Sequence, residues 1–139
     1  MREESGKRKG KRKGWKNMED PLLKYPFYVK ACTLYEDMME DSESLGQDYR
    51  GREISRQLVR SSGSISANIE EGYGRGTGKE FIYFLTVACG SARETRGWYK
   101  RSKRFLETGL IETRMGQTDE IIALLVTTIK TLKQGGKEE

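Results

Sequence analysis

Between residues 24 and 134, apolar side chains recur at intervals of three and four residues, the repeat of one face of an α-helix. The first such stretch begins near Pro26, which suits the first turn of a helix because its φ is already fixed. The others span about 49–72, 78–107 and 118–132. No alternation typical of a β-strand has a useful length, so we predict an all-α, antiparallel up-down-up-down four-helix bundle. The positions that define its four stripes are Phe27, Ala31, Leu34, Tyr35 and Met38; Ile54, Leu58, Ser61, Ile65, Asn68 and Gly72; Phe81, Leu85, Ala88, Ala92, Thr95 and Tyr99; and Ile121, Ile122, Leu125, Ile129 and Leu132.

A glycine-rich segment joins the two central helices. Gly72 or Gly74 is expected to end the second helix in the left-handed conformation. Thr77 and Glu80 have the spacing of a capping box that starts the third helix. The segment has some likeness to a phosphate-binding loop, but a Walker A motif would need glycine at Tyr73 and serine or threonine at Glu80. We therefore interpret it as a structural hinge.

Near its middle, the second helix contains Ser61-Ser62-Gly63-Ser64, which is poor material for a helix. A helix keeps such small residues where a neighbouring helix approaches closely, and we prefer this interpretation to a catalytic serine. The chain has no histidine, and no lysine lies near these serines in the sequence, so nothing evident would activate a hydroxyl nucleophile. With two cysteines and no histidine, a thiolate zinc site is also excluded. No catalytic residue, metal site or cofactor is predicted.

A chain of 139 residues is ordinarily one domain, which we assign to residues 21–134. Residues 1–20 are basic, glycine-rich and almost devoid of apolar side chains, so a disordered tail is expected there, and residues 135–139 should be a flexible end. No apolar run is long enough to span a membrane, and no secretory signal is recognisable. Cys32 and Cys89 are expected to be buried free thiols rather than a disulfide, consistent with a cytoplasmic location.

The net charge of +5 is unevenly distributed along the chain. It is +6 in residues 1–16, −6 in 17–49, +7 in 50–104 and −2 in 105–139. Positive charge therefore collects in the tail and in the two central helices, where RNA or DNA is a plausible partner. The alternative for the tail is that it only keeps the chain soluble. The tail cations that we expect to contact nucleic acid are Lys7, Arg8, Lys9, Lys11, Arg12 and Lys13.

Helical geometry arranges the central cations in two stripes. Arg52, Arg56 and Arg60 are four residues apart, and each lies about 200° around the helix from a core position two residues away, so they should point outward. Phosphate binding needs little more than such a row of cations. The alternative is that the arginines pair with the acidic first helix of the same or a neighbouring copy, and the sequence leaves both open. The remaining candidates are Arg75 and Lys79 near the start of the third helix, and Arg93, Arg96, Lys100, Lys103 and Arg104 along it.

Two groups of acidic and amide side chains need a structural interpretation. Asn68, Glu71 and Glu94 are expected to be buried, and a hydrogen-bonded network that fixes helix register is preferred to an active site. The first helix ends in an acidic cluster whose spacing does not match a calcium loop, so a solvated helix end is expected. That cluster consists of Glu36, Asp37, Glu40, Asp41 and Glu43.

The first half of the third helix is apolar on nearly every side, because Ile82, Tyr83 and Val87 lie beside or behind its core face. A helix that is apolar all round must be covered all round. Four helices of one chain cannot easily provide that cover, so these three residues are predicted to form an interface between identical copies.

The central helices also carry a dense set of motifs. The pattern Ser-Ile-x-x-Asn-Ile-x-Glu-Gly is preceded by Gln-x-x-Arg and followed by Glu-Phe-Ile-x-Phe-Leu and Gly-Ser-x-x-Glu. With these motifs, residues 24–134 resemble a family of four-helix-bundle proteins first noticed in intervening sequences of bacterial 23S ribosomal RNA. That family also includes the accessory variability determinants of diversity-generating retroelements. The matching residues are Gln57 and Arg60; Ser64, Ile65, Asn68, Ile69, Glu71 and Gly72; Glu80 to Leu85; and Gly90, Ser91 and Glu94.

The resemblance implies a homopentameric barrel with a basic surface and no established enzymatic activity. In the retroelement branch it implies binding to nucleic acid and to a reverse transcriptase. We therefore expect a non-enzymatic, oligomeric nucleic-acid-binding accessory protein, acting with a reverse transcriptase in the retroelement case. The alternative is a protein–protein scaffold of the intervening-sequence type with no nucleic-acid role. The chain departs from the family pattern in its basic tail and in residues 41–48, which lack the usual Phe-Pro.

Overall fold

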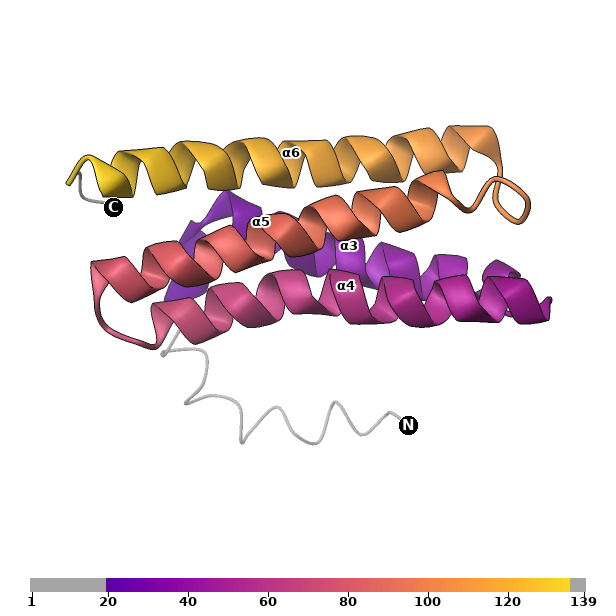
Figure 1. Cartoon of the computed structure of the whole chain (residues 1–139), viewed down its shortest axis with the longest axis horizontal. Coiled ribbons are helices and arrows are strands. Elements are labelled where there is room, and N and C mark those ends of the chain that lie inside the picture. Colours follow the sequence, from indigo (N-terminus) through magenta and orange to yellow (C-terminus); the bar gives the residue numbers. More distant parts are fainter. Residues whose placement is uncertain (1–19, 136–139) are drawn as a thin grey trace, which may run out of the picture.

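Four long helices run back and forth along one axis, each antiparallel to the one before it (Figure 1). The computed structural model describes residues 20–135, and within that range it contains no strand, so the prediction of an all-α four-helix chain is confirmed. Each helix packs against the next, and α3 also packs against α6, which closes the bundle. The elements are the 3₁₀ helix η1 (Pro21–Lys24) and the α-helices α3 (Pro26–Leu45), α4 (Tyr49–Tyr73), α5 (Gly78–Lys100) and α6 (Thr108–Lys133).

Local signals fix most of the helix starts. Pro26 is the first residue of α3, as predicted. The Asp48 side chain caps α4 by accepting a hydrogen bond from the backbone N–H of Arg50 at 2.8 Å. Hydrogen bonds from the Arg50 side chain and backbone lower the pKa of that carboxyl to about 2. The predicted cap at Thr77 is confirmed, because its hydroxyl accepts from the N–H of Glu80 at 3.1 Å.

The prediction of a left-handed glycine at Gly72 or Gly74 is wrong. Gly72 is buried inside α4, and Gly74 caps the helix with a right-handed φ of −78°. The positive φ, +87°, occurs at Gly76, where the chain reverses direction. Gly72 is needed for a different reason: a Cβ added there would lie 2.6 Å from the Cβ of Phe84 on α5. Position 72 therefore needs glycine because α5 approaches α4 too closely there for a larger side chain.

The predicted boundary between the last two helices is also wrong. Helix α5 ends at Lys100 rather than near Glu107, and α6 begins at Thr108 rather than near Thr118. The six residues after Lys100 form turns that bring Leu106 into the core at 8% exposure. Thr118 is fully buried inside α6, where its hydroxyl donates to the carbonyl of Met115, so it caps nothing. The residues before Thr118 are helical because they carry the apolar face of α6 on to Ile111.

The core divides into two clusters along the bundle. One lies around Leu34, Ile65 and Leu85, and the other around Leu58 and Tyr99. Both cysteines are free thiols: Cys89 is buried and Cys32 is half-buried, with its pKa raised by burial. The predicted core stripes are buried or half-buried at every position.

Small residues allow α4 and α5 to pack closely, as the serine-rich segment predicted. The Thr95 hydroxyl donates to Ser61 Oγ at 2.9 Å, and Ser61 is fully buried. One helical turn away, the hydroxyls of Ser64 and Ser91 are 2.9 Å apart. These contacts set the register that places the outer side chains of the two helices opposite one another.

Candidate nucleic-acid interface

The arginine stripe on α4 points outward, as predicted, but two of its three charges are already paired. Arg52, Arg56 and Arg60 are all exposed. Arg56 lies 3.4 Å from Glu53 on the same helix, and Arg60 lies 2.5 Å from Glu94 on α5. Exposed pairs of this kind are weak, but each cancels much of the local potential that a phosphate would sense.

The two hinge cations differ in the same way. Arg75 is paired with Glu71 at 2.8 Å and lies over the ring of Phe84, with 5.3 Å between guanidinium carbon and ring centroid. Lys79 is exposed and forms no ion pair within residues 20–135. The sequence pattern assigned Arg75 and Lys79 the same role, but in the structure only Lys79 has an unpaired charge among the described residues.

The cations near the C-terminal end of α5 are different, because most of them have no acidic partner. Arg93, Lys100 and Lys103 are exposed and form no ion pair with any described carboxylate. Arg96 is the exception, with its Nε 2.7 Å from Asp119 on α6. We call this area the α5 cationic surface; it surrounds a groove of about 520 Å³. No acidic residue lines the groove, which is formed by Arg93, Arg96, Gly97, Lys100, Arg101 and Lys103. Arg104, also exposed, follows directly.

Sequence analysis missed Arg101, which lines this groove. Its guanidinium carbon lies 5.0 Å from the centroid of the Trp98 ring, a cation–π arrangement. The signal was present in the sequence as a tryptophan and an arginine three residues apart near the end of a helix.

The ion pairs test whether the candidate arginines pair with the acidic first helix of the same copy, which is one part of the alternative to nucleic-acid binding. The carboxylates paired with the candidate arginines belong to α4, α5 and α6, and in the described part of the chain none belongs to α3. Pairing of these arginines with the acidic first helix of the same copy is therefore wrong. Pairing with a neighbouring copy stays a prediction.

The acidic end of α3 has a partner that the sequence did not reveal. Asp41 is buried at 6% exposure and accepts hydrogen bonds from Arg114 of α6 and Tyr99 of α5. Asp37 accepts from Gln117 at 3.0 Å. The prediction of a solvated acidic end is thus wrong for Asp41 and holds for Glu36, Glu40 and Glu43, which are exposed.

Contacts within this buried cluster shift the pKa values of Tyr99 and Arg114. Burial and the hydrogen bond to Asp41 raise the pKa of the Tyr99 phenol. The hydrogen bonds to Asp41 raise the pKa of the Arg114 guanidinium. The arrangement keeps the phenol protonated and the guanidinium charged, which suits a clamp between three helices.

The prediction that Asn68, Glu71 and Glu94 form one buried network is wrong within one chain, although two of them take part in contacts between α4 and α5. Asn68 is half-buried and donates to the carbonyl and the hydroxyl of Ser64, at 2.8 and 2.9 Å, and that hydroxyl contacts Ser91 of α5. Glu71 is exposed, and its partner is Arg75, whereas Glu94 pairs with Arg60. Asn68, through Ser64, and Glu94, through Arg60, bridge α4 and α5 separately, whereas Glu71 pairs with Arg75 after the end of α4.

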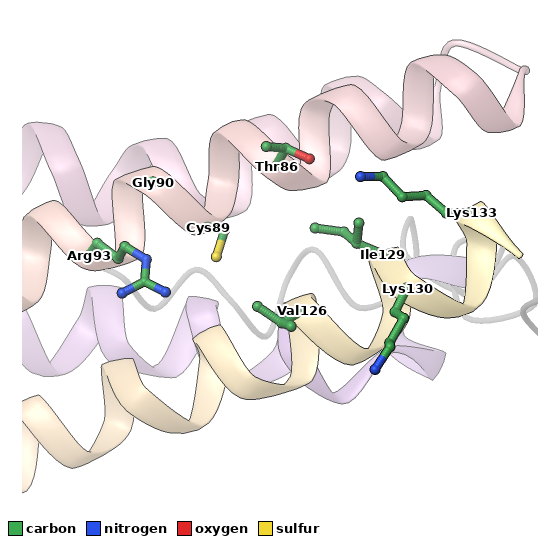
Figure 2. A pocket seen from close by; sticks show the side chains of 8 residues that line it. All are labelled: Thr86, Cys89, Gly90, Arg93, Val126, Ile129, Lys130 and Lys133. Carbon is green, nitrogen blue, oxygen red and sulfur yellow. The ribbon is translucent and has the colours of Figure 1, made fainter.

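Part of the apolar surface of α5 is not covered by the described residues 20–135. Tyr83 is 61% exposed, whereas Ile82 and Val87 are half-buried. A groove of about 550 Å³ lies between α5 and α6 (Figure 2). Cys89 from α5 and Val126 from α6 point into it, and Val126 is 47% exposed. The interface assigned to Ile82, Tyr83 and Val87 stays a prediction.

Two sequence predictions concern the ends of the chain. The tail cations Lys7 to Lys13 and the flexible end at 136–139 lie outside the described residues. Among residues 20–135, no helix combines the length and the apolar character that crossing a bilayer requires.

Comparison with known proteins places the chain in a family. A solved structure of a protein with unknown function from the S23 ribosomal protein family of Bacteroides thetaiotaomicron is 27% identical, with a TM-score of 0.70. The match covers 99% of that protein and 76% of this chain. A search of the curated proteins found no match. The family model described as 23S rRNA-intervening sequence protein matches residues 24–129. Because that match spans more than half of the sequence, this chain belongs to the 23S rRNA-intervening sequence protein family.

Proposed function

We propose that this chain is a non-catalytic nucleic-acid-binding protein that uses the α5 cationic surface. The observation that carries the proposal is the contrast between paired and unpaired cations. On α4 the charges of Arg56 and Arg60 are offset by neighbouring carboxylates, whereas Arg93 and Lys100 on α5 and Lys103 just after it have none among the described residues. An anionic ligand would meet the least competition there.

Phosphate chemistry fits such a surface. Exposed cations attract phosphates mainly as point charges, and their binding releases counterions condensed on the nucleic acid. The affinity for single strands should therefore fall with salt, with a log–log slope of about −0.7 per phosphate neutralised.

A salt titration with matched variants tests the proposal. Fluorescence anisotropy would follow a labelled RNA oligonucleotide bound to the wild type, to Arg93→Gln/Lys100→Gln/Lys103→Gln and to the α4 control Arg52→Gln/Arg56→Gln/Arg60→Gln. We expect the α5 variant to lose affinity and to reduce the slope by about 2 for three lost contacts. The α4 control should change both much less, although it removes the same charge. Equal effects of the two variants, or no binding by the wild type at low salt, would contradict the proposal.

The proposal includes self-assembly. Tyr83 and Val126 expose apolar surface, and the groove between α5 and α6 adds more. Cover by identical copies would bury this surface and repeat the cationic surface around a ring. The resemblance implies five copies, and in one branch of the family it implies a reverse transcriptase as the protein partner.

A second candidate function is a protein–protein scaffold without a nucleic-acid role. The same exposed apolar groove supports it, because apolar grooves are common docking surfaces for proteins. The two candidates differ in an affinity pull-down. A specific protein partner retained after nuclease treatment, together with absent RNA binding, would favour the scaffold.

A further inference from the structure

Arg101, which lines the cationic groove at the end of α5, makes a cation–π contact with Trp98 that phosphate binding alone does not require. Arg101 lies over the ring of Trp98, with 5.0 Å between the guanidinium carbon and the ring centroid. Trp98 is half-buried and packs against the core cluster around Leu58 and Tyr99, so the ring has a fixed support. Arg101 itself is exposed.

A glycine one turn earlier makes room for this pair. A Cβ added at Gly97 would lie 2.8 Å from Nη1 of Arg101, so any larger residue there would push the guanidinium aside. The guanidinium therefore lies against the helix surface at Gly97 rather than extending into solvent.

The groove next to the pair is large enough for a nucleotide. Its volume, about 520 Å³, falls within the range of about 300–1,000 Å³ that is typical of small-molecule sites. Arg93, Lys100 and Lys103 line it together with Arg101. A flat cationic group and several separate point charges thus lie within one groove.

A planar cation beside several point charges suits the unpaired bases and phosphates of a single strand. Bases splayed out of a single strand stack on aromatic rings and on guanidinium planes, whereas the bases of a duplex are already stacked on one another. Resting on the proposed function, we propose that this groove binds single-stranded nucleic acid, with one base stacked on the Trp98–Arg101 pair. The flanking phosphates then lie against Lys100, Lys103 and Arg93.

Under this proposal, duplex and single-stranded nucleic acid depend on different features of the groove. A duplex would contact the lysines and arginines through its phosphates and would not need Gly97 or the plane of Arg101. A single strand would need both. Substitutions that keep the charge but alter the plane therefore distinguish stacking from simple neutralisation.

Two such variants are available. Arg101→Lys keeps the positive charge and loses the planar group, and Gly97→Ala displaces the guanidinium without touching any charge. Arg56→Lys on α4 is the matched control, because it makes the same exchange of a planar cation for an ammonium group at an exposed position outside the groove. All three would be tested by anisotropy on a 12-nucleotide RNA and on the same sequence as a duplex.

We expect Arg101→Lys and Gly97→Ala to weaken single-strand binding about five- to tenfold while leaving the salt slope unchanged. Duplex binding should change by less than about twofold, and Arg56→Lys should alter neither. In a Trp15→Phe background, the fluorescence of Trp98 should be quenched by the single strand and not by the duplex.

The outcomes distinguish this inference from the proposed function. Equal affinity for both forms, with no effect of Arg101→Lys or Gly97→Ala and no quenching, would overturn the stacking site while nucleic-acid binding stood. Absence of any binding by the wild type at low salt would overturn both.

Discussion

Arg114 of α6 donates two hydrogen bonds to the carboxylate of Asp41 on α3, from Nε at 2.7 Å and from Nη2 at 3.0 Å. Tyr99 of α5 donates to the same carboxylate at 2.5 Å. The two ends of the bundle sequence are thereby tied together, because α3 and α6 are the first and last long helices. A buried carboxylate with three donors is held in one position, and so are the helices that supply them.

Removal of Arg114 should be strongly destabilising. Arg114→Met would leave the Asp41 carboxylate buried without its charged partner, and breaking such a pair costs about 3–5 kcal/mol. Denaturant unfolding followed by circular dichroism would measure the loss. The control is Arg96→Met, which breaks an exposed pair of similar length and should cost less than about 1 kcal/mol. A similar small loss for both variants would show that the buried pair is not a clamp.

The cluster of Asp41, Tyr99 and Arg114 also predicts that the free energy of unfolding depends on pH in the alkaline range. Burial and Asp41 raise the pKa of Tyr99 above the ordinary value of about 10. Above that pH the unfolded chain releases the Tyr99 proton and the folded chain keeps it. The stabilisation is therefore complete below pH 10 and is lost as the pH rises towards the folded pKa. In Tyr99→Phe, stability should fall less steeply between pH 10 and 11.5, by up to about 1.4 kcal/mol per pH unit. Parallel curves for the two proteins would contradict this.

The fold was predictable from sequence where the signals are local. Pro26 and Thr77 start helices through their own backbone and side-chain chemistry, and the apolar stripes fix which faces are buried. The start of α6 was not predictable in this way. Gly109 and Gly116 weaken its helical signal, and the position that would continue the buried face holds Arg114. Its partner Asp41 lies 73 residues away, and only the folded chain brings the two together.

The candidate site was predictable only in part. Sequence gives the sign and spacing of the cations, and these placed Arg60 and Lys100 in equivalent stripes. It does not give ion pairing, because Glu94 reaches Arg60 only through the register of α4 against α5. The cation–π contact of Arg101 with Trp98 joins residues three apart and was readable in the sequence, although the pattern placed Arg101 inside a longer helix.

Two glycines in helix interiors should respond to alanine in opposite ways. A Cβ at Gly72 would lie 2.6 Å from the Cβ of Phe84, so Gly72→Ala should force α4 and α5 apart and cost about 1–3 kcal/mol. A Cβ at Gly116 would meet nothing within 4 Å, so Gly116→Ala should stabilise the chain by about 0.5–1 kcal/mol. Thermal unfolding of the two variants would give the comparison. A gain in stability for Gly72→Ala would show that the close approach is unimportant.

The exposed apolar surface of α5 predicts how assembly should be disrupted. Tyr83 is 61% exposed in the single chain, so Tyr83→Glu should leave the fold intact but place a charge in any interface that covers this surface. We expect the wild type to have several times the chain mass of 16.0 kDa in light scattering at micromolar concentration, and Tyr83→Glu to approach that mass. Thr113→Glu, an equally charged change at an exposed position of α6 away from the α5–α6 groove, is the control and should assemble normally. A wild type of single-chain mass would contradict self-assembly, and an assembled Tyr83→Glu would move the interface away from this face.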